Sequence, residues 1–212
     1  MQHLDSFMQF QPDGVQCYLF PPLTALCDFQ TKQVKVGVQN AYPTYNGSVT
    51  GEVGAMQLEE FGIKTVLIGH SERRTLLNES QELIAKKFAY YKQLGYEIIY
   101  CIGEDLDTRQ NGDVEQFLQG QLEGIDLEYE KLIVAYEPVW AIGTGQSASS
   151  ETIVQTHKMI KQMITKVPLL YGGSVKPDSA QSICSLEGVD GVLVGSASLQ
   201  VESFQEIITN SL

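Results

Sequence analysis

Several features that would assign this 212-residue chain to a common class of protein are missing from it. It has only three arginines and a formal net charge of −12, with no basic cluster of the kind that binds nucleic acids. No apolar run reaches the roughly 18 residues of a membrane span. The first residues, 1–5, lack the basic and apolar regions of a secretory signal. We therefore expect neither a nucleic-acid nor a membrane partner.

Cysteine pairs are missing as well, because no C-x-x-C motif occurs among the four cysteines Cys17, Cys27, Cys101 and Cys184. Their spacing argues against a zinc site and against thioredoxin-like chemistry. Reduced thiols in a cytoplasmic protein are the simpler interpretation. The length and the 43% hydrophobic content suit one domain, residues 1–212, with a sizeable core.

What the chain does contain is a series of short apolar runs separated by amphipathic stretches. Continuous apolar runs are typical of parallel strands buried on both faces, and their alternation with helices predicts βα units. Seven strands are more than most doubly wound sheets have, and one fewer than a closed barrel needs. The runs are Cys17–Phe20, Val34–Gln39, Thr65–Gly69, Ile98–Gly103, Leu132–Glu137, Pro168–Gly172 and Gly191–Gly195. The clearest helices are Ser80–Leu94, Ser150–Lys166 and Pro177–Ser185.

Polar residues follow the carboxyl ends of these runs, where the active sites of barrel enzymes lie. Glu137 ends one run and is followed by an apolar but glycine-bearing segment, 138–145. A carboxylate buried there would have a raised pKa and would suit a general base. A structural ion pair is the alternative for Glu137. An apolar loop with glycines is typical of a lid that closes over a site.

His70 follows another run and is predicted to act as an electrophile or an acid, or else to be a core histidine bonded to the backbone. Arg73 and Arg74 are predicted to be mainly structural, and His3 and His157 to be solvated or packing residues. Two small-residue turns, 172–174 and 195–196, each open a helix and suit a phosphate group. The loop 42–50 carries two tyrosines, which favours either a protein contact or an ordinary solvated loop.

These residues resemble the motifs of the triosephosphate isomerase family, in the family's order and from about Cys17 to the C-terminus. The matching segments are 69–74, 135–145 and 171–175, with shorter matches at 39–40, 50–52, 101–104 and 193–195. The resemblance implies a (β/α)8 barrel that interconverts dihydroxyacetone phosphate and glyceraldehyde 3-phosphate through an enediolate. It also implies a homodimer, a cytoplasmic location and no cofactor or metal.

The resemblance also implies roles for single residues. Glu137 resembles the general base, His70 the electrophile that polarises the carbonyl, and Glu72 a supporting carboxylate. Cys101 resembles a cysteine packed behind the base, and the loop around Thr50 the dimer contact. Arg73 and Glu79 resemble a structural ion pair. The amides of the phosphate site correspond to Gly143, Ser174, Gly195 and Ser196. The lid corresponds to Pro138, Val139, Trp140, Ala141, Ile142, Gly143, Thr144 and Gly145.

The N-terminal part departs from the family pattern. The family opens with a strand that ends in an Asn-x-Lys motif, and residues 1–20 contain no such motif. The first run leads into Pro21-Pro22, as the second strand of the family does, and Leu4, Phe7 and Met8 resemble the tail of its first helix. We therefore expect about 25 residues of a barrel of about 250 to be missing. Lys176, at a helix start, is not expected to replace the lysine.

Three hypotheses follow from these patterns. The first is an isomerase whose recorded start is too late. The second is a catalytically inactive homologue that acts at most as a phosphate-binding or interaction module. The third is another phosphate-binding barrel isomerase, which the run around Glu137 disfavours.

Overall fold

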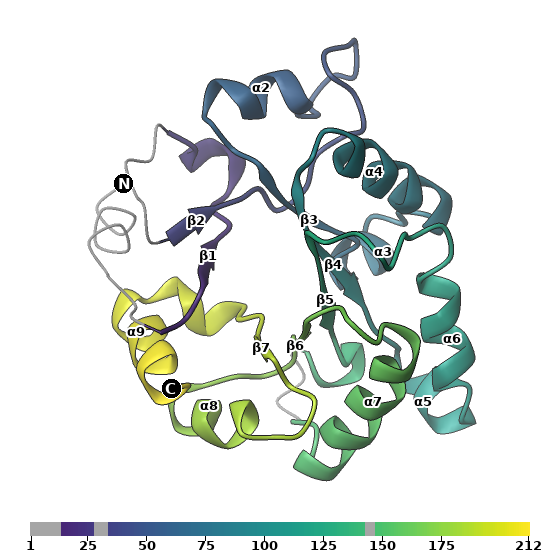
Figure 1. Cartoon of the computed structure of the whole chain (residues 1–212), viewed down its shortest axis with the longest axis vertical. Helices are drawn as coiled ribbons and strands as arrows, with labels where there is room; N and C mark the ends of the chain where they lie inside the picture. The colour runs from purple at the N-terminus through teal and green to yellow at the C-terminus, as the bar shows by residue number, and fades with distance from the viewer. Residues whose placement is uncertain (1–13, 28–33, 143–146) are drawn as a thin grey trace. The chain divides into compact units, whose positions relative to one another are not determined.

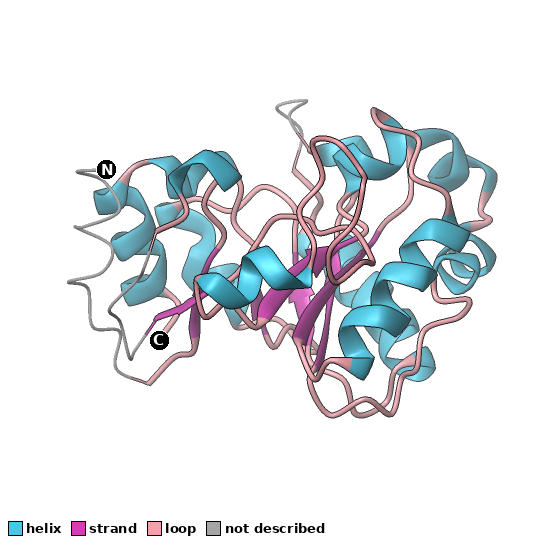
Figure 2. Ribbon diagram, turned by 90° about the horizontal axis from the view of Figure 1, so that it is seen from above, coloured by secondary structure: helices cyan, strands magenta, loops and turns pink. Residues whose placement is uncertain are grey.

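A computed structural model describes residues 14–27, 34–142 and 147–212 of the chain. It consists of two compact units, Met1–Tyr100 and Cys101–Leu212. Both units are built from parallel strands that alternate with helices, and this alternation can be followed along the chain in Figures 1 and 2. The expected single domain, 1–212, stays a prediction.

Among its described residues, the first unit contains three whole strands and most of a fourth. In chain order its described elements are β1 (Cys17–Leu19), η1 (Leu23–Ala25), β2 (Val34–Val36), α2 (Ala55–Glu60), β3 (Thr65–Ile68), α3 (Ser71–Thr75), α4 (Gln81–Gln93) and β4 (Glu97–Ile102), whose last two residues belong to the second unit.

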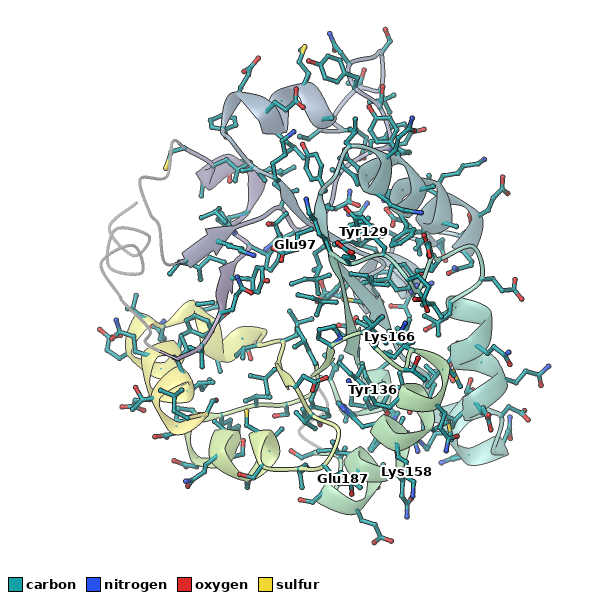
Figure 3. All side chains as sticks on the ribbon, viewed as in Figure 1. Glu97, Tyr129, Tyr136, Lys158, Lys166 and Glu187 are labelled. Atoms are coloured by element: carbon teal, nitrogen blue, oxygen red, sulfur yellow. The ribbon has the colours of Figure 1, made fainter. Side chains whose placement is uncertain are left out.

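The strands of the first unit pair in parallel. β1 pairs with β2, and β3 pairs with β4 in a register that sets Thr65 opposite Glu97. Beyond the end of β2, Val38 forms a single parallel bridge with Val66 of β3. Glu97, labelled in Figure 3, also accepts hydrogen bonds from Tyr18 at 3.0 Å and from Lys35 at 2.9 Å. These contacts connect the side chains of β1, β2 and β4.

Helix α4 begins and ends near the predicted residues. The Ser80 hydroxyl accepts a hydrogen bond from the backbone N–H of Leu83, which caps the first turn. After the last turn, Gly95 has a φ of 73°, a left-handed conformation that glycine adopts without strain. The prediction of a helix over residues 80–94 is therefore confirmed to within one residue at each end.

A buried ion-pair cluster surrounds Glu79, the residue before the Ser80 cap. One oxygen of Glu79 accepts hydrogen bonds from Arg73 at 2.6 Å and from Lys87 at 2.5 Å. The Lys87 side chain is 1% exposed and also donates to Asn40 at 2.7 Å. Burial by itself would raise the pKa of Glu79, but the bonds from Arg73 and Lys87 outweigh it and lower that pKa. The predicted structural pair Arg73–Glu79 is thus confirmed.

The second unit begins in the last residues of β4 and continues to the C-terminus. In chain order its described elements are α5 (Leu106–Asn111), α6 (Val114–Gln121), β5 (Leu132–Tyr136), η2 (Val139–Ala141), α7 (Ser150–Met163), β6 (Leu169–Tyr171), α8 (Pro177–Cys184), β7 (Gly191–Val192), η3 (Ser196–Leu199) and α9 (Val201–Asn210).

The second unit has the parallel strand order β5, β6, β7. In this register Tyr136 at the end of β5 lies opposite Tyr171 at the end of β6, so the residues after both strands emerge at one edge. Helices α8 and α9 pack against each other (Figure 1). Helix α9 buries Val201, Phe204, Ile207 and Ile208, spaced as one face of a helix.

Helix α7 differs from the prediction at its C-terminal end. The Ser149 hydroxyl caps its first turn as the sequence indicates, but the helix ends at Met163 and not at Lys166. The Nζ atom of Lys161 donates to the carbonyl of Val167 at 3.0 Å, and the chain turns toward β6 there. The predicted end at Lys166 is therefore three residues too late, and the chain after Met163 leads into Pro168, which cannot continue a helix.

The apolar core agrees with the predicted strands. Each of the seven predicted runs coincides with one strand, although β4 begins one residue before its run, at Glu97. Strands β3, β4 and β5 are buried over nearly their whole length. The four cysteines all lie in described residues and all are free thiols. Within residues 14–27, 34–142 and 147–212, no helix has the length and apolar character needed to cross a membrane.

Candidate active site

Glu137 is a buried carboxylate at the carboxyl end of β5. The residue is 2% exposed, and its backbone N–H donates a hydrogen bond of 2.8 Å to the carbonyl of Ile102 at the end of β4. The predicted burial of this side chain is confirmed. A carboxylate in such a place pays a desolvation cost in its charged form, which is the condition that makes a carboxylate a stronger base.

Three glycines allow the chain to pack tightly around Glu137. A Cβ atom on Gly103 would lie 1.8 Å from the Glu137 carbonyl oxygen, so the backbones of these two residues are in direct contact. A Cβ on Gly172 would lie 3.0 Å from Cγ of Glu137, and one on Gly173 would lie 3.0 Å from Cγ of Pro138. The glycines after β4 and β6 therefore fix the position of Glu137 from two sides.

The first part of the predicted lid is held in place from β4. Pro138 is buried, residues Val139–Ala141 form the short helix η2, and the N–H of Val139 donates to the carbonyl of Glu104 at 3.1 Å. The indole N–H of Trp140 donates to the Glu104 carboxylate at 2.8 Å. Of the predicted lid, Gly143, Thr144 and Gly145 lie outside the described residues.

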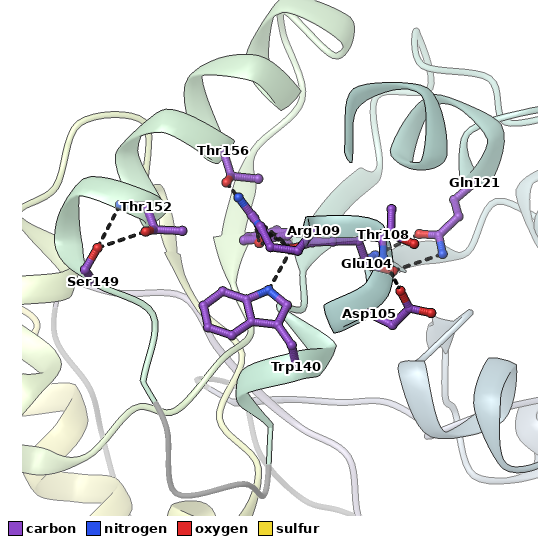
Figure 4. A network of polar contacts seen from close by, with 11 residues as sticks. Glu104, Asp105, Thr108, Arg109, Gln121, Trp140, Ser149, Thr152 and Thr156 are labelled. Carbon is purple, nitrogen blue, oxygen red and sulfur yellow. Dashed lines mark hydrogen bonds and ion pairs between the residues drawn. The ribbon is translucent and has the colours of Figure 1, made fainter. Parts of the chain in front are cut away.

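Glu104 is the centre of a polar network that Figure 4 shows from close by. Its side chain is fully buried, and one carboxylate oxygen accepts from Arg109 Nη2 at 2.7 Å, Trp140 at 2.8 Å and the Tyr136 hydroxyl at 3.0 Å. Arg109 also donates to Thr156 at 3.0 Å and lies over the Trp140 ring. Burial, then the charge of Glu104, raises the pKa of Tyr136, so its hydroxyl remains a donor. The network joins α5, β5, η2 and α7.

The residues predicted to bind phosphate follow β6 and β7, two neighbouring parallel strands. Ser174 is half-buried three residues after β6, whereas Gly195 and Ser196 are exposed after β7, where η3 begins. No acceptor among the described residues takes up the backbone N–H groups of Ser174, Gly195 and Ser196. Amide donors of this kind suit an anion. Gly143, the fourth predicted donor, lies outside the described residues.

His70 lies in the first unit, at the start of the short helix α3. Its Nδ1 atom accepts a hydrogen bond of 3.3 Å from the backbone N–H of Glu72. Because Nδ1 accepts, the proton of the neutral ring is on Nε2, which makes Nε2 a donor. The Glu72 side chain is 69% exposed, with one oxygen 3.7 Å from Nδ1. The backbone bond of the alternative interpretation is therefore present, although the His70 side chain is 28% exposed and not in the core, and the role of electrophile or acid stays a prediction.

Arg74 holds the residue before His70. Its Nε atom donates to the carbonyl of Gly69 at 2.8 Å, and its guanidinium group also bonds Gln81 at 2.9 Å and the Tyr100 hydroxyl at 3.2 Å. Gly69 has a φ of 78°, so the turn that presents His70 depends on a glycine. The structural role predicted for Arg74 is confirmed, because its side chain holds the carbonyl of Gly69 in the turn that precedes His70.

Other sequence predictions have mixed outcomes. His157 is fully buried and packs between the rings of Tyr136 and Tyr171, whereas His3 lies outside the described residues. Cys101 is buried in β4. The expectation of two exposed tyrosines in the loop 42–50 holds for Tyr45, which is 53% exposed. Tyr42 is half-buried instead, and its carbonyl accepts a hydrogen bond from the Tyr91 hydroxyl.

Sequence reasoning assigned no role to Glu104 and Arg109, which contact Trp140, or to Gln121, which bonds Gly103. Glu104 has a local signal, since it follows a buried strand as Glu137 does. Arg109 and Gln121 resemble ordinary polar residues of surface helices. In the described part of the chain, no group of three or more His, Cys, Asp or Glu side chains could hold a metal ion.

Comparison with known proteins places these features in one family. The sequence model of the family described as triosephosphate isomerase matches residues 1–211. A triosephosphate isomerase of a Sulfurovum species is 58% identical over 193 residues, covering 90% of this chain and 83% of that protein. That of Wolinella succinogenes is 55% identical over 98% of this chain and 90% of its own length. That of Helicobacter hepaticus is 53% identical, with coverages of 93% and 84%.

Proposed function

Because the chain belongs to the triosephosphate isomerase family, we propose that it interconverts dihydroxyacetone phosphate and D-glyceraldehyde 3-phosphate by proton transfer through an enediolate. The fold class is the (β/α)8 barrel of that family. The substrate is a small phosphorylated triose, and the reaction is an aldose–ketose isomerisation.

The burial of Glu137 is the observation that carries the proposal. This carboxylate is 2% exposed at the end of β5, between the glycine-bearing segments after β4 and β6. In the proposed reaction Glu137 removes a proton from one substrate carbon and returns it to the neighbouring carbon. Because the carboxylate is shielded from water, hydration does not stabilise its charged form and so does not weaken it as a base. Its backbone contacts fix its position relative to the substrate.

His70 is proposed to act on the substrate oxygens. The N–H of Glu72 occupies Nδ1, so Nε2 carries the proton and donates to the carbonyl oxygen on which negative charge develops. Glu72 is proposed as the supporting carboxylate, because its backbone N–H already holds the ring through Nδ1 and its exposed side chain lies beside the ring.

The phosphate group is proposed to bind the amides of Gly143, Ser174, Gly195 and Ser196. Backbone donors suit a chain whose net charge is −12, because they attract an anion without a basic surface. The lid, Pro138–Gly145, is proposed to close over the enediolate and exclude water, which would otherwise promote loss of phosphate. The hydrogen bond from Trp140 to Glu104 holds the first half of the proposed lid against the segment after β4.

A homodimer formed through the loop around Thr50 is proposed together with this activity. Tyr45 of this loop supports it, because its side chain is 53% exposed. Large apolar side chains in contact with water are typical of an interface. Sedimentation of the protein with Tyr45→Ser tests this proposal, and an unchanged mass distribution would contradict it. We also propose a cytoplasmic location, which the four free thiols support.

A coupled assay of the purified protein tests the activity. Glu137→Asp shortens the side chain by one methylene, so we expect kcat to fall on the order of a hundredfold while KM changes little. Glu115→Asp, on the exposed face of α6, is the matched control. Equal rates for the wild type and Glu137→Asp would remove Glu137 from the role of base. A folded wild type without turnover would refute the activity itself.

A further inference from the structure

The side chain of Gln121 makes two hydrogen bonds to one residue, Gly103 (Figure 4). Its carboxamide oxygen accepts from the Gly103 N–H at 2.7 Å, and its NH2 group donates to the Gly103 carbonyl at 3.1 Å. Gln121 is the last residue of α6, so a helix end reaches the backbone just beyond β4. The amide satisfies both polar backbone groups of that residue, as a neighbouring strand would.

Gly103 is in turn in direct contact with the backbone of Glu137. A Cβ on Gly103 would lie 1.8 Å from the Glu137 carbonyl oxygen and 2.7 Å from its carbonyl carbon. The residue before Gly103 also holds Glu137, since the Ile102 carbonyl accepts the Glu137 N–H at 2.8 Å. A displacement of Gly103 toward β5 is therefore a displacement of Glu137.

The residue after Gly103 holds the beginning of the lid. The Glu104 carbonyl accepts the N–H of Val139 at 3.1 Å, and its carboxylate accepts the indole N–H of Trp140 at 2.8 Å. Three consecutive residues, Ile102, Gly103 and Glu104, thus contact Glu137 and η2. Gln121 bonds the middle residue, Gly103, from the end of α6, which lies 18 residues further along the chain.

We propose that Gln121 is a positioning residue for catalysis, because its two-bond clamp on Gly103 fixes the segment against which the backbone of Glu137 rests. The inference depends on the proposed role of Glu137 as the base. A base displaced by a fraction of an ångström reaches the transition state poorly, whereas the binding of ground-state substrate depends mainly on other groups. A residue that only stabilised the fold would change the melting temperature and leave kcat of the folded protein unchanged.

Two variants of Gln121 separate these possibilities. Gln121→Met keeps the length of the side chain and removes both hydrogen bonds. Gln121→Glu keeps the acceptor for the Gly103 N–H and loses the donor to the Gly103 carbonyl. Gln116→Met is the matched control, because Gln116 is an exposed residue of the same helix. Circular dichroism establishes that each protein is folded at the assay temperature.

For Gln121→Met we expect kcat to fall on the order of tenfold or more and KM to stay within about threefold. A fall is also expected for Gln121→Glu, because its second carboxylate oxygen would face the Gly103 carbonyl without a proton to donate, and none is expected for Gln116→Met. Because Gln121 acts through Glu137, its loss should cost less in the Glu137→Asp background than in the wild type.

Two results would overturn the inference. One is wild-type kcat in both folded Gln121 variants, and the other is an equal proportional loss in the Glu137→Asp background. Failure of the proposed function has a different signature, namely an inactive wild type or a Glu137→Asp variant with the wild-type rate.

Discussion

The indole N–H of Trp140 donates a 2.8 Å hydrogen bond to the fully buried carboxylate of Glu104. This contact joins the start of the lid to the end of β4, two residues beyond the carbonyl that accepts the Glu137 N–H. The base and the lid are therefore anchored to the same short segment, Ile102–Glu104. A disturbance of this segment should affect catalysis and lid conformation together.

Removing the charge of Glu104 should destabilise the second unit and change the environment of Trp140. In Glu104→Gln, Arg109 loses its counter-charge. Removing one partner of a buried ion pair lowers the free energy of unfolding by about 3–5 kcal/mol, and we expect a loss at the lower end of this range. The lower end applies because the Arg109 side chain is 26% exposed. Trp140 is the one tryptophan of the chain, so its fluorescence reports the change directly.

Urea unfolding and tryptophan emission check this prediction for Glu104→Gln. Glu115→Gln, on the exposed surface of α6, serves as the control. Unchanged emission in Glu104→Gln would mean that the charge of Glu104 does not hold the indole.

Replacing Gly103 by alanine should be severely damaging, although the substitution adds one methyl group. The new Cβ would lie 1.8 Å from the Glu137 carbonyl oxygen, and a backbone atom cannot move aside as a side chain does. We expect destabilisation of about 1–3 kcal/mol or more, with a loss of kcat. Gly120→Ala is the control, since a Cβ there would meet nothing within 4 Å. In a helix this exchange should stabilise the protein by about 0.5–1 kcal/mol. Equal unfolding midpoints for the two variants would contradict the prediction.

The ion pairs of helix α4 should differ sharply in importance. Glu79→Gln leaves the Lys87 ammonium, 1% exposed, without its carboxylate, which should cost about 3–5 kcal/mol. Glu82→Gln breaks the pair with Lys86, in which both side chains face solvent, and should leave the unfolding midpoint unchanged. Chemical denaturation of the two variants measures the difference. Similar midpoints would show that burial of Lys87 does not determine the strength of its pair.

His157 should make the protein less stable in mild acid. Burial lowers the pKa of His157 below its ordinary value of 6.5, and its Nδ1 bonds the carbonyl of Gly188. The unfolded chain therefore binds the proton first. The stability that His157 contributes is complete above pH 6.5 and is lost as the pH falls from 6.5 toward the lower folded-state pKa, by up to about 1.4 kcal/mol per pH unit.

Thermal melts of the wild type and His157→Asn between pH 7.5 and 5.5 test this prediction. Asparagine can keep a donor near Gly188 but does not titrate, so the slope of stability against pH should flatten. The variant should also be less stable at neutral pH, because the ring that packs against Tyr136 is lost. Parallel slopes for the two proteins would exclude His157 as the titrating group.

Local patterns were sufficient to predict much of this protein. Ser80 and Gly95 bound α4 because a hydroxyl caps a first turn and a glycine accepts a positive φ, and both effects depend on neighbouring residues. The continuous apolar run of β5 predicted a buried strand, and therefore the burial of Glu137 at its end. The position of His70 predicted an electrophile or acid, or else a histidine bonded to the backbone, and of these the structure shows the backbone bond from Glu72.

The sequence by itself thus determined the order of strands and helices and the caps, because these depend on contacts within a few residues, whereas the two residues proposed to move protons were predicted from the resemblance of their motifs to the family. Only the tertiary structure decided that the Tyr42 carbonyl accepts the Tyr91 hydroxyl and that Gln121 bonds Gly103. Each of these depends on a partner brought close by folding, in the last case across 18 residues of chain. Nothing in the residues next to Gln121 distinguishes it from a solvated glutamine, since its role arises from the backbone that it meets.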